Sequence, residues 1–265
     1  MRSVRVILVG AAALCFSQLL VAQDIPRTPE GRPDLSGHWE NTTRLSPLAL
    51  QIETSEGESL NRIDQSARFV PPEDVPGVLP WTEEPTYKPE HRARVAELYA
   101  RANRFDPVVY CGKPGVPRVG PPRRIVQLPD EMIFLYEEMA GDVYRIIPTD
   151  GRPHDEFANP APYGDSVGRW EGDVLVVDVT SFDDSTWLGE RGYFHTDAMR
   201  VTERLFLHEG NLIYQVTVDD PNVLVEPWTM PPRAVSPDGL ELQESAPCIE
   251  EDAQYFINDD HHIQR

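Results

Sequence analysis

The sequence predicts an all-β protein made of antiparallel strands, arranged as a barrel or a sandwich, with one short helix and long proline-rich loops. Six strand-like stretches follow one another after residue 123 with no helical pattern between them, which is typical of antiparallel meanders. Turn-forming sequences separate several of these stretches at the spacing of hairpins. The 26 prolines among 265 residues add many breaks and leave room for few long helices.

The N-terminal residues predict an export signal of the Sec type. Two arginines precede an apolar run over residues 6–21, and Ala22 offers the small residue that cleavage needs. The run is shorter than the roughly 20 apolar residues of a membrane span, so we expect cleavage rather than a retained anchor. This interpretation divides the chain into a signal peptide at 1–22 and a single domain at 23–265 that is periplasmic or secreted and has no membrane insertion after cleavage.

Two cysteines, Cys111 and Cys248, remain after removal of the signal. In an oxidising compartment two cysteines of one chain normally pair, so we expect a disulfide between them. Two free thiols are the alternative.

The formal net charge is −20. A surface of this sign repels phosphate backbones and anionic lipid headgroups. Nucleic acid and membrane surfaces are therefore disfavoured as partners, and the sequence carries no prediction of an oligomeric state.

The N-terminal half is predicted from proline positions and helical spacing. Residues 35–40 (LSGHWE) predict a first short strand. The stretch 64–90 carries repeated prolines and predicts an irregular insertion on the surface. Pro89 suits the first turn of a helix, and one face of that helix then carries apolar residues at helical spacing, namely Val95, Leu98, Tyr99 and Ala102.

The C-terminal half supplies the strands and a closing segment. Residues 231–265 are acidic and weakly patterned, and we expect them to close the fold through Cys248. The predicted strands are RIVQL (124–128), MIFLYEEM (132–139), DVYRIIP (142–148), DVLVVDVTSF (173–182), MRVTERLFLH (199–208) and NLIYQVTVDD (211–220).

Two motifs resemble the calycin superfamily, which contains lipocalins and fatty-acid-binding proteins. SGHW at 36–39 is similar to the Gly-x-Trp of the first lipocalin strand, and residues 170–177 with 201–218 are similar in rhythm to late hairpins of fatty-acid-binding proteins. The resemblance implies a calycin-like, up-and-down antiparallel barrel. The proline-rich insertion departs from the pattern of that superfamily.

A second resemblance covers most of the chain after the signal. It is to a family of uncharacterised secreted bacterial proteins, and it implies export but supplies no activity. The motifs that carry it are TPEGRPDLSGHW (28–39), CGKPGVPR (111–118), TDGRPHDE (149–156), GDSVGRWEGDVLVVDVTSFDDSTW (164–187), HTDAMRVTERL (195–205) and DDPNVLVEPW (219–228).

Two carboxylates interrupt apolar strand faces. Asp178 stands among valines, and Glu203 stands between Val201 and Leu205. A buried ionised carboxylate is costly unless it is paired or hydrogen-bonded. Either these acids form structural ion pairs with arginines such as Arg145, Arg169 or Arg204, or they line a cavity shared by water and a ligand.

The cavity alternative predicts an acid–base site. Asp178 or Glu203 would act as general base or acid, His195 would share the proton transfer, and Arg204 or Arg169 would stabilise developing negative charge. The residues predicted to bind substrate are Trp170, Tyr163, Trp187, Phe194, His154 and Arg169. The alternatives are aromatic side chains that fill the core, a solvated loop position for His195, and local hydrogen bonds from His154 to Asp150 or Asp155.

Motifs for a metal, a nucleotide or a serine nucleophile are weak. GDSVG at 164–168 places Ser166 before a strand instead of in the strand–turn–helix elbow of hydrolases. His195 and Asp197 with a C-terminal histidine imitate an iron-binding triad, but His-x-Asp often arises by chance. No glycine-rich phosphate loop is present, so neither a metal nor an organic cofactor is expected.

The sequence therefore predicts an exported, cofactor-independent enzyme that performs a lyase, isomerase or cyclase step on a small, largely apolar molecule. The alternative is a non-catalytic, lipocalin-like carrier with the same cavity. A structural protein of the envelope, with a filled core, is a third possibility.

Overall fold

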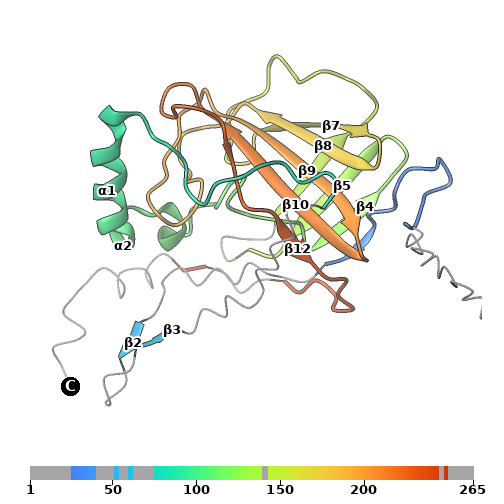
Figure 1. Ribbon diagram of the computed structural model, residues 1–265, viewed down its shortest axis with the longest axis horizontal. Helices are drawn as coiled ribbons and strands as arrows, with labels where there is room; N and C mark the ends of the chain where they lie inside the picture. The colour runs from blue at the N-terminus through green and yellow to red at the C-terminus, as the bar shows by residue number, and fades with distance from the viewer. Residues whose placement is uncertain are drawn as a thin grey trace, which may run out of the picture.

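The computed structural model describes residues 25–39, 75–138, 143–244 and 248–249, together with the backbone of 51–53 and 59–61. Within these residues the chain is mostly β and forms two antiparallel sheets (Figure 1), which confirms the predicted all-β antiparallel class. A separate pair of short strands consists of β2 (Gln51–Glu53) and β3 (Ser59–Asn61). The predicted signal peptide lies outside the described residues.

The first sheet has the strand order β1-β4-β5-β6. Along β5 the residues Met132, Phe134 and Tyr136 are buried, and their neighbours are only half-buried, because successive side chains of a strand point to opposite faces. The strands of this sheet are β1 (Gly37–His38), β4 (Arg124–Gln127), β5 (Glu131–Tyr136) and β6 (Val143–Pro148).

The second sheet has the strand order β11-β10-β9-β8-β7, and β12 also pairs with β10. Glu209 and Gly210, both with positive φ, form the two-residue turn between β9 and β10, as tight hairpins favour. β7 is absent from the six predicted strands because its sequence, DSVGRWE, lacks a regular apolar alternation. The strands are β7 (Asp165–Glu171), β8 (Val174–Thr180), β9 (Arg200–His208), β10 (Asn211–Asp219), β11 (Trp228–Thr229) and β12 (Arg233–Val235).

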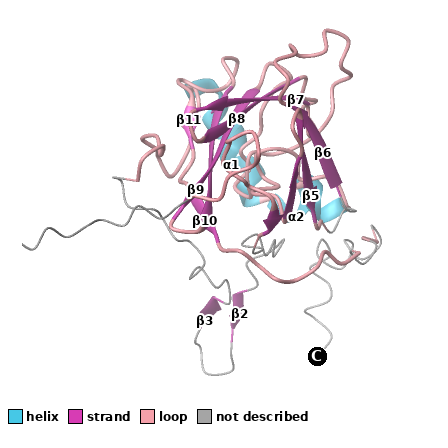
Figure 2. Cartoon of the chain, turned by 90° about the vertical axis from the view of Figure 1, so that its right-hand side faces the viewer, coloured by secondary structure: helices cyan, strands magenta, loops and turns pink. Residues whose placement is uncertain are grey.

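The two sheets face each other across one hydrophobic core (Figure 2). They come together at β6 and β7, where a Cβ on Gly168 would lie 2.9 Å from Cγ2 of Thr149 and 3.1 Å from Cγ2 of Ile147. Among the described residues no strand ladder joins β6 to β7, so the two sheets do not form a closed barrel there.

The predicted helix is present but packs more loosely than its apolar face suggests. A 3₁₀ turn, η2 (Pro89–His91), leads into α1 (Arg92–Ala100), and α2 (Ala102–Phe105) and the 3₁₀ turn η3 (Pro107–Tyr110) follow. No residue of α1 is buried, although Val95 and Leu98 contact the core. The helix therefore lies at the edge of the protein (Figure 1).

The described part of the proline-rich insertion is packed against the second sheet. Val75 joins a small apolar cluster with Phe206 and Ile213 on the face turned away from the first sheet. Leu79 accepts a hydrogen bond from Nε2 of Gln215 at 2.9 Å and donates one to its Oε1 at 2.8 Å. This described part is irregular and contacts the outer face of the sheet.

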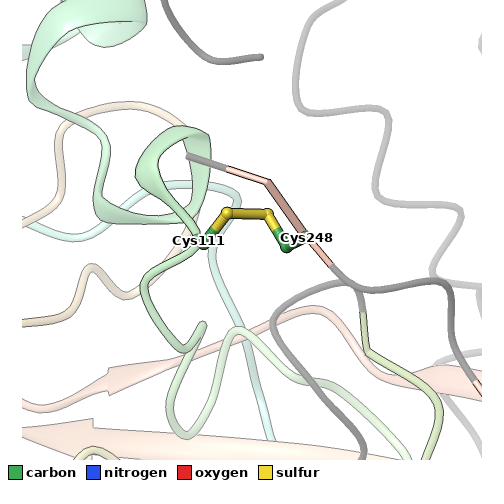
Figure 3. Close-up of a disulfide and its surroundings, with 2 residues drawn as sticks. All are labelled: Cys111 and Cys248. Carbon is green, nitrogen blue, oxygen red and sulfur yellow. A yellow bond between two sulfur atoms is a disulfide. The ribbon is translucent and has the colours of Figure 1, made fainter. Parts of the chain in front are cut away.

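The predicted disulfide between Cys111 and Cys248 is present (Figure 3). Cys111 follows η3, and Cys248 belongs to the acidic C-terminal segment, so the bond ties that segment to the helical region. Earlier in the same segment β12 pairs with β10.

Candidate functional site

Glu203 lies on the inner face of β9, where it is fully buried and paired. Arg145 of β6 donates from Nη1 to Oε1 at 3.0 Å and from Nη2 to Oε2 at 2.6 Å, and the Tyr214 hydroxyl donates to Oε1 at 2.8 Å. Arg145 also donates to Oγ of Ser166 at 2.9 Å and to the hydroxyl of Tyr136 at 3.2 Å. Glu203 therefore takes the ion-pair alternative, with Arg145 as its partner.

The groups around this pair keep their protons. Burial raises the pKa of Tyr214 and of Tyr136 above the ordinary value, so both phenols stay neutral and the first donates to Glu203. Burial alone would lower the pKa of Arg145, but the charge and hydrogen bond of Glu203, together with Tyr136 and Tyr214, outweigh it and the net shift is upward. The cluster is a neutralised polar network inside the core.

Asp178 lies on the opposite face of the same sheet. The register pairs Val177 with Glu203 and Asp178 with Thr202, and residues paired across antiparallel strands share a face. The carboxylate of Asp178 therefore points away from Glu203, with its side chain 30% exposed. The two acids do not share one cavity.

Asp178 instead takes part in a cluster with His154. Nδ1 of His154 lies 2.6 Å from Oδ2 of Asp165, and Nε2 lies 3.2 Å from Oδ2 of Asp178. Both contacts are hydrogen bonds at once only when both ring nitrogens carry protons. Arg200 approaches Asp178 at 4.0 Å. The sequence offered Asp150 or Asp155 as local partners of His154. In the structure its ring instead contacts Asp165 of β7 and Asp178 of β8.

His195 is buried, and both of its ring nitrogens have hydrogen-bond partners. Its Nδ1 lies 3.0 Å from the carbonyl oxygen of Thr196, so Nδ1 donates, and Nε2 accepts from the Thr186 hydroxyl at 2.7 Å. Burial lowers the pKa of His195, which favours this neutral form. The solvated loop position considered from the sequence is also wrong, because only 3% of the residue is exposed.

The residues predicted to act together are therefore distributed over three places. Asp178, Glu203 and His195 have no hydrogen-bond or ion-pair partner in common among the described residues. Arg204 and Arg169 both bind the carboxylate of Glu171, at 3.1 Å and 2.8 Å. Neither arginine is directed at a predicted catalytic group.

The aromatic residues predicted to bind substrate mostly fill the core. Trp187, Phe194 and Tyr163 are buried, and the first two are joined by a β-bridge. Trp170 is half-buried, with the guanidinium of Arg32 5.9 Å from its ring. The core-filling alternative thus describes three of the four.

A groove of about 480 Å³ lies between α1 and the loops at 84–87 and 191–193. Tyrosine rings and small apolar side chains form its walls, and one acid and two arginines add charge. The apolar and aromatic wall residues are Pro85, Tyr87, Val95, Ala96, Tyr99 and Tyr193.

Contacts to the backbone hold α1 and the loops at 84–87 and 191–193 in place around the groove. Tyr87 forms a β-bridge with Leu224, and its hydroxyl donates to the carbonyl oxygen of Phe194 at 2.5 Å. Gly192, with φ of +72°, lets α1 approach so closely that a Cβ would lie 2.7 Å from the backbone nitrogen of Tyr99. Any side chain at Gly192 would therefore push the helix away.

Stacked aromatic rings form one wall of the groove. The rings of Tyr87 and Tyr193 lie 6.1 Å apart with an interplanar angle of 26°, and Trp228 meets Tyr193 edge-on at 6.0 Å. Burial raises the pKa of Tyr87 and of Tyr193. These phenols stay neutral, and the wall is mainly apolar.

Tyr99 shows what sequence reasoning missed. Its helical spacing grouped it with the core-facing residues Val95, Leu98 and Ala102, yet Tyr99 is 59% exposed and lines the groove. Tyr87 and Tyr99 come from neighbouring segments, but Tyr193 lies far along the chain from both, so no sequence motif unites the three groove tyrosines. Only the fold brings them together.

Comparison with known proteins adds no assignment. The chain matches no protein-family model, no curated protein and no solved structure. In the part of the chain that the structure describes, no group of three or more His, Cys, Asp or Glu side chains is placed to hold a metal ion. No described helix has both the length and the apolar character to cross a membrane.

Proposed function

We propose that this is an exported binding protein for a small molecule with a flat, apolar body, which occupies the groove between α1 and the loops at 84–87 and 191–193. The observation that carries the proposal is the groove, whose volume of about 480 Å³ falls within the roughly 300–1,000 Å³ of ligand pockets. Tyrosine walls offer large flat contact areas with polar rims. The disulfide supports the exported location.

Binding without catalysis is favoured by the state of the predicted acid–base groups. Glu203 is neutralised by Arg145, and His195 is buried with Thr186 as its partner. Neither group lines the groove. A ligand in the groove would meet phenols, a carboxylate and guanidiniums, which orient a molecule but include no imidazole to transfer a proton near neutral pH.

Titration calorimetry of the mature chain with the flat apolar probe 2-naphthol tests the proposal. We expect saturable binding that Tyr99→Ala weakens about tenfold, because one aromatic wall is lost. Tyr144→Ala is the matched control, since Tyr144 on β6 is 65% exposed and does not line the groove. Binding that is equally strong in Tyr99→Ala would contradict the proposal.

A second candidate is a cofactor-independent acid–base enzyme of lyase or isomerase type. It is favoured by His154, whose ring lies between Asp165 and Asp178 with about a fifth of its side chain exposed. Such an enzyme should speed deuterium incorporation at the carbon next to the carbonyl of 2-tetralone, and His154→Gln should remove that acceleration. Equal exchange rates with and without protein would rule out this enzymatic activity and leave binding as the only proposed function.

The strand order supports a calycin-like barrel as the finer description of the fold. A β-bridge between Trp39 and Pro237, and a hydrogen bond of 2.8 Å from the Asp238 nitrogen to the His38 oxygen, connect β1 to the segment after β12. The sheets would then be continuous on that side and close by contact at β6 and β7. Slow amide exchange at 37–39 and 233–238 is the expected signature.

A further inference from the structure

Within the described part of the chain, the charged side chains of the groove leave one cation without a counterion. Nη1 of Arg191 lies 2.5 Å from Oε1 of Glu84, so these two neutralise each other. Arg92 also lines the groove. Among the described residues it has no carboxylate within ion-pair distance, and its one hydrogen bond runs from Nε to the carbonyl oxygen of Tyr87 at 3.1 Å.

The hydrogen bond to Tyr87 fixes how Arg92 presents its charge. Because Nε is occupied, the guanidinium plane is held and the two Nη groups stay available. Paired Nη donors in one plane match the two oxygens of a carboxylate. The anchoring also lowers the conformational entropy that the side chain loses when it binds an anion.

We propose that the ligand of the groove is an aromatic carboxylate, whose ring lies against Tyr99, Tyr87 and Tyr193 and whose carboxylate is held by Arg92. This inference rests on the proposed binding function and adds the class of ligand. The free charge in the groove is positive although the whole chain carries −20, so the local field selects an anion that most of the surface would repel.

The groove also excludes other ligand classes. An ammonium ligand would meet the unpaired guanidinium of Arg92, whereas the carboxylate of Glu84 is already occupied by Arg191. A long alkyl chain would gain less from flat ring walls than an aromatic ring, which stacks on them.

The test compares 2-naphthoate with its neutral analogue 2-naphthol by titration calorimetry on the mature, oxidised chain. We expect 2-naphthoate to bind at least about tenfold more tightly, with an affinity that falls as salt rises. Arg92→Gln should reduce the affinity for 2-naphthoate to that for 2-naphthol, and Arg92→Lys should retain part of the difference because it keeps the charge without the fork.

Arg101→Gln is the matched control. Arg101 is exposed and lies at the other end of the same helix, with its Nη1 3.5 Å from Oε1 of Glu97. Its substitution should leave the affinities for 2-naphthoate and for 2-naphthol unchanged. Circular dichroism of each variant verifies folding.

The outcomes separate the two proposals. If both probes bind equally and both are weakened by Tyr99→Ala, the inference is overturned and the binding function stands. If 2-naphthoate binds more tightly but Arg92→Gln leaves its advantage, the carboxylate is held elsewhere and the inference is overturned. If neither probe binds, both proposals fail.

Discussion

Arg145 and Glu203 form a buried ion pair with both carboxylate oxygens bonded. Removing two charges from water is costly, and only their mutual contact and the surrounding hydroxyls offset that cost. Such a pair contributes little compared with apolar residues of the same size, but each partner depends on the other. The pair also links β6 of one sheet to β9 of the other.

Glu203→Gln should lower the free energy of unfolding by about 3–5 kcal/mol, because Arg145 is then left as a buried, uncompensated charge. The double variant Arg145→Met, Glu203→Leu should recover most of this loss. Urea unfolding of the singles and the double measures both effects. The exposed Arg169→Gln is the control and should change stability by less than about 0.5 kcal/mol.

Wild-type stability in Glu203→Gln would show that the pair does not matter for folding. The same variant bears on catalysis, because an unfolded Glu203→Gln would be inactive for structural reasons. His154→Gln, at a partly exposed position, is therefore the cleaner variant for testing acid–base chemistry.

At the scale of elements, β7 decides how the two sheets meet. Gly168 lies where β7 approaches Ile147 and Thr149 at the end of β6. A residue with a side chain would need β7 or β6 to move by several tenths of an ångström. The glycine therefore fixes the distance between the sheets at their contact.

Gly168→Ala should destabilise the protein by about 1–3 kcal/mol, the typical cost of overpacking. Gly189→Ala is the control, because a Cβ at Gly189 would lie 4.0 Å from the nearest atom, Cδ2 of Tyr193. Thermal unfolding of the two variants gives the comparison. Equal melting temperatures would mean that the sheets do not depend on this close contact.

Most of the long strands could be predicted from the sequence, with β7 as the exception, but their register could not. Alternation along 174–180 correctly separates Asp178 from Val177, and alternation along 200–208 correctly groups Glu203 with Val201. Which face of one strand joins which face of the next depends on pairing between distant residues. Placing Asp178 and Glu203 in one cavity was wrong for that reason.

At the scale of the whole molecule, the disulfide joins residues 137 positions apart. It connects the turn after α2 with the C-terminal segment (Figure 3). A link over so long a loop restricts the unfolded chain strongly, by roughly 5 kcal/mol in the chain-entropy model. The pairing could be predicted because removal of the predicted signal peptide would leave two cysteines.

Cys111→Ser with Cys248→Ser should lower the free energy of unfolding by about 2–5 kcal/mol. Guanidinium unfolding of this variant, beside the oxidised and the reduced wild type, measures the loss. The reduced wild type should match the double variant. An unchanged unfolding midpoint in all three would show that the bond does not stabilise the fold.

The candidate groove could not be predicted, although several of its residues lie in predicted elements. Its walls come from the proline-rich insertion, from α1 and from the loop before β9, and no periodicity connects these segments. Tyr99 on α1 resembles a core residue by spacing alone. Gly192 closely approaches the backbone of α1 at Tyr99, yet the Tyr99 residue itself is 59% exposed.

The loose packing of α1 against the protein affects which ligands the groove can select. No side chain of α1 is buried, so the free energy needed to separate this helix from the rest of the protein is far lower than that needed to separate the strands. The width of the groove can thus adjust through displacement of one helix while both sheets keep their shape. We therefore expect the affinity of the groove to depend more on the charge of a ligand than on its thickness. Chemically related acids of different size should compete for the groove.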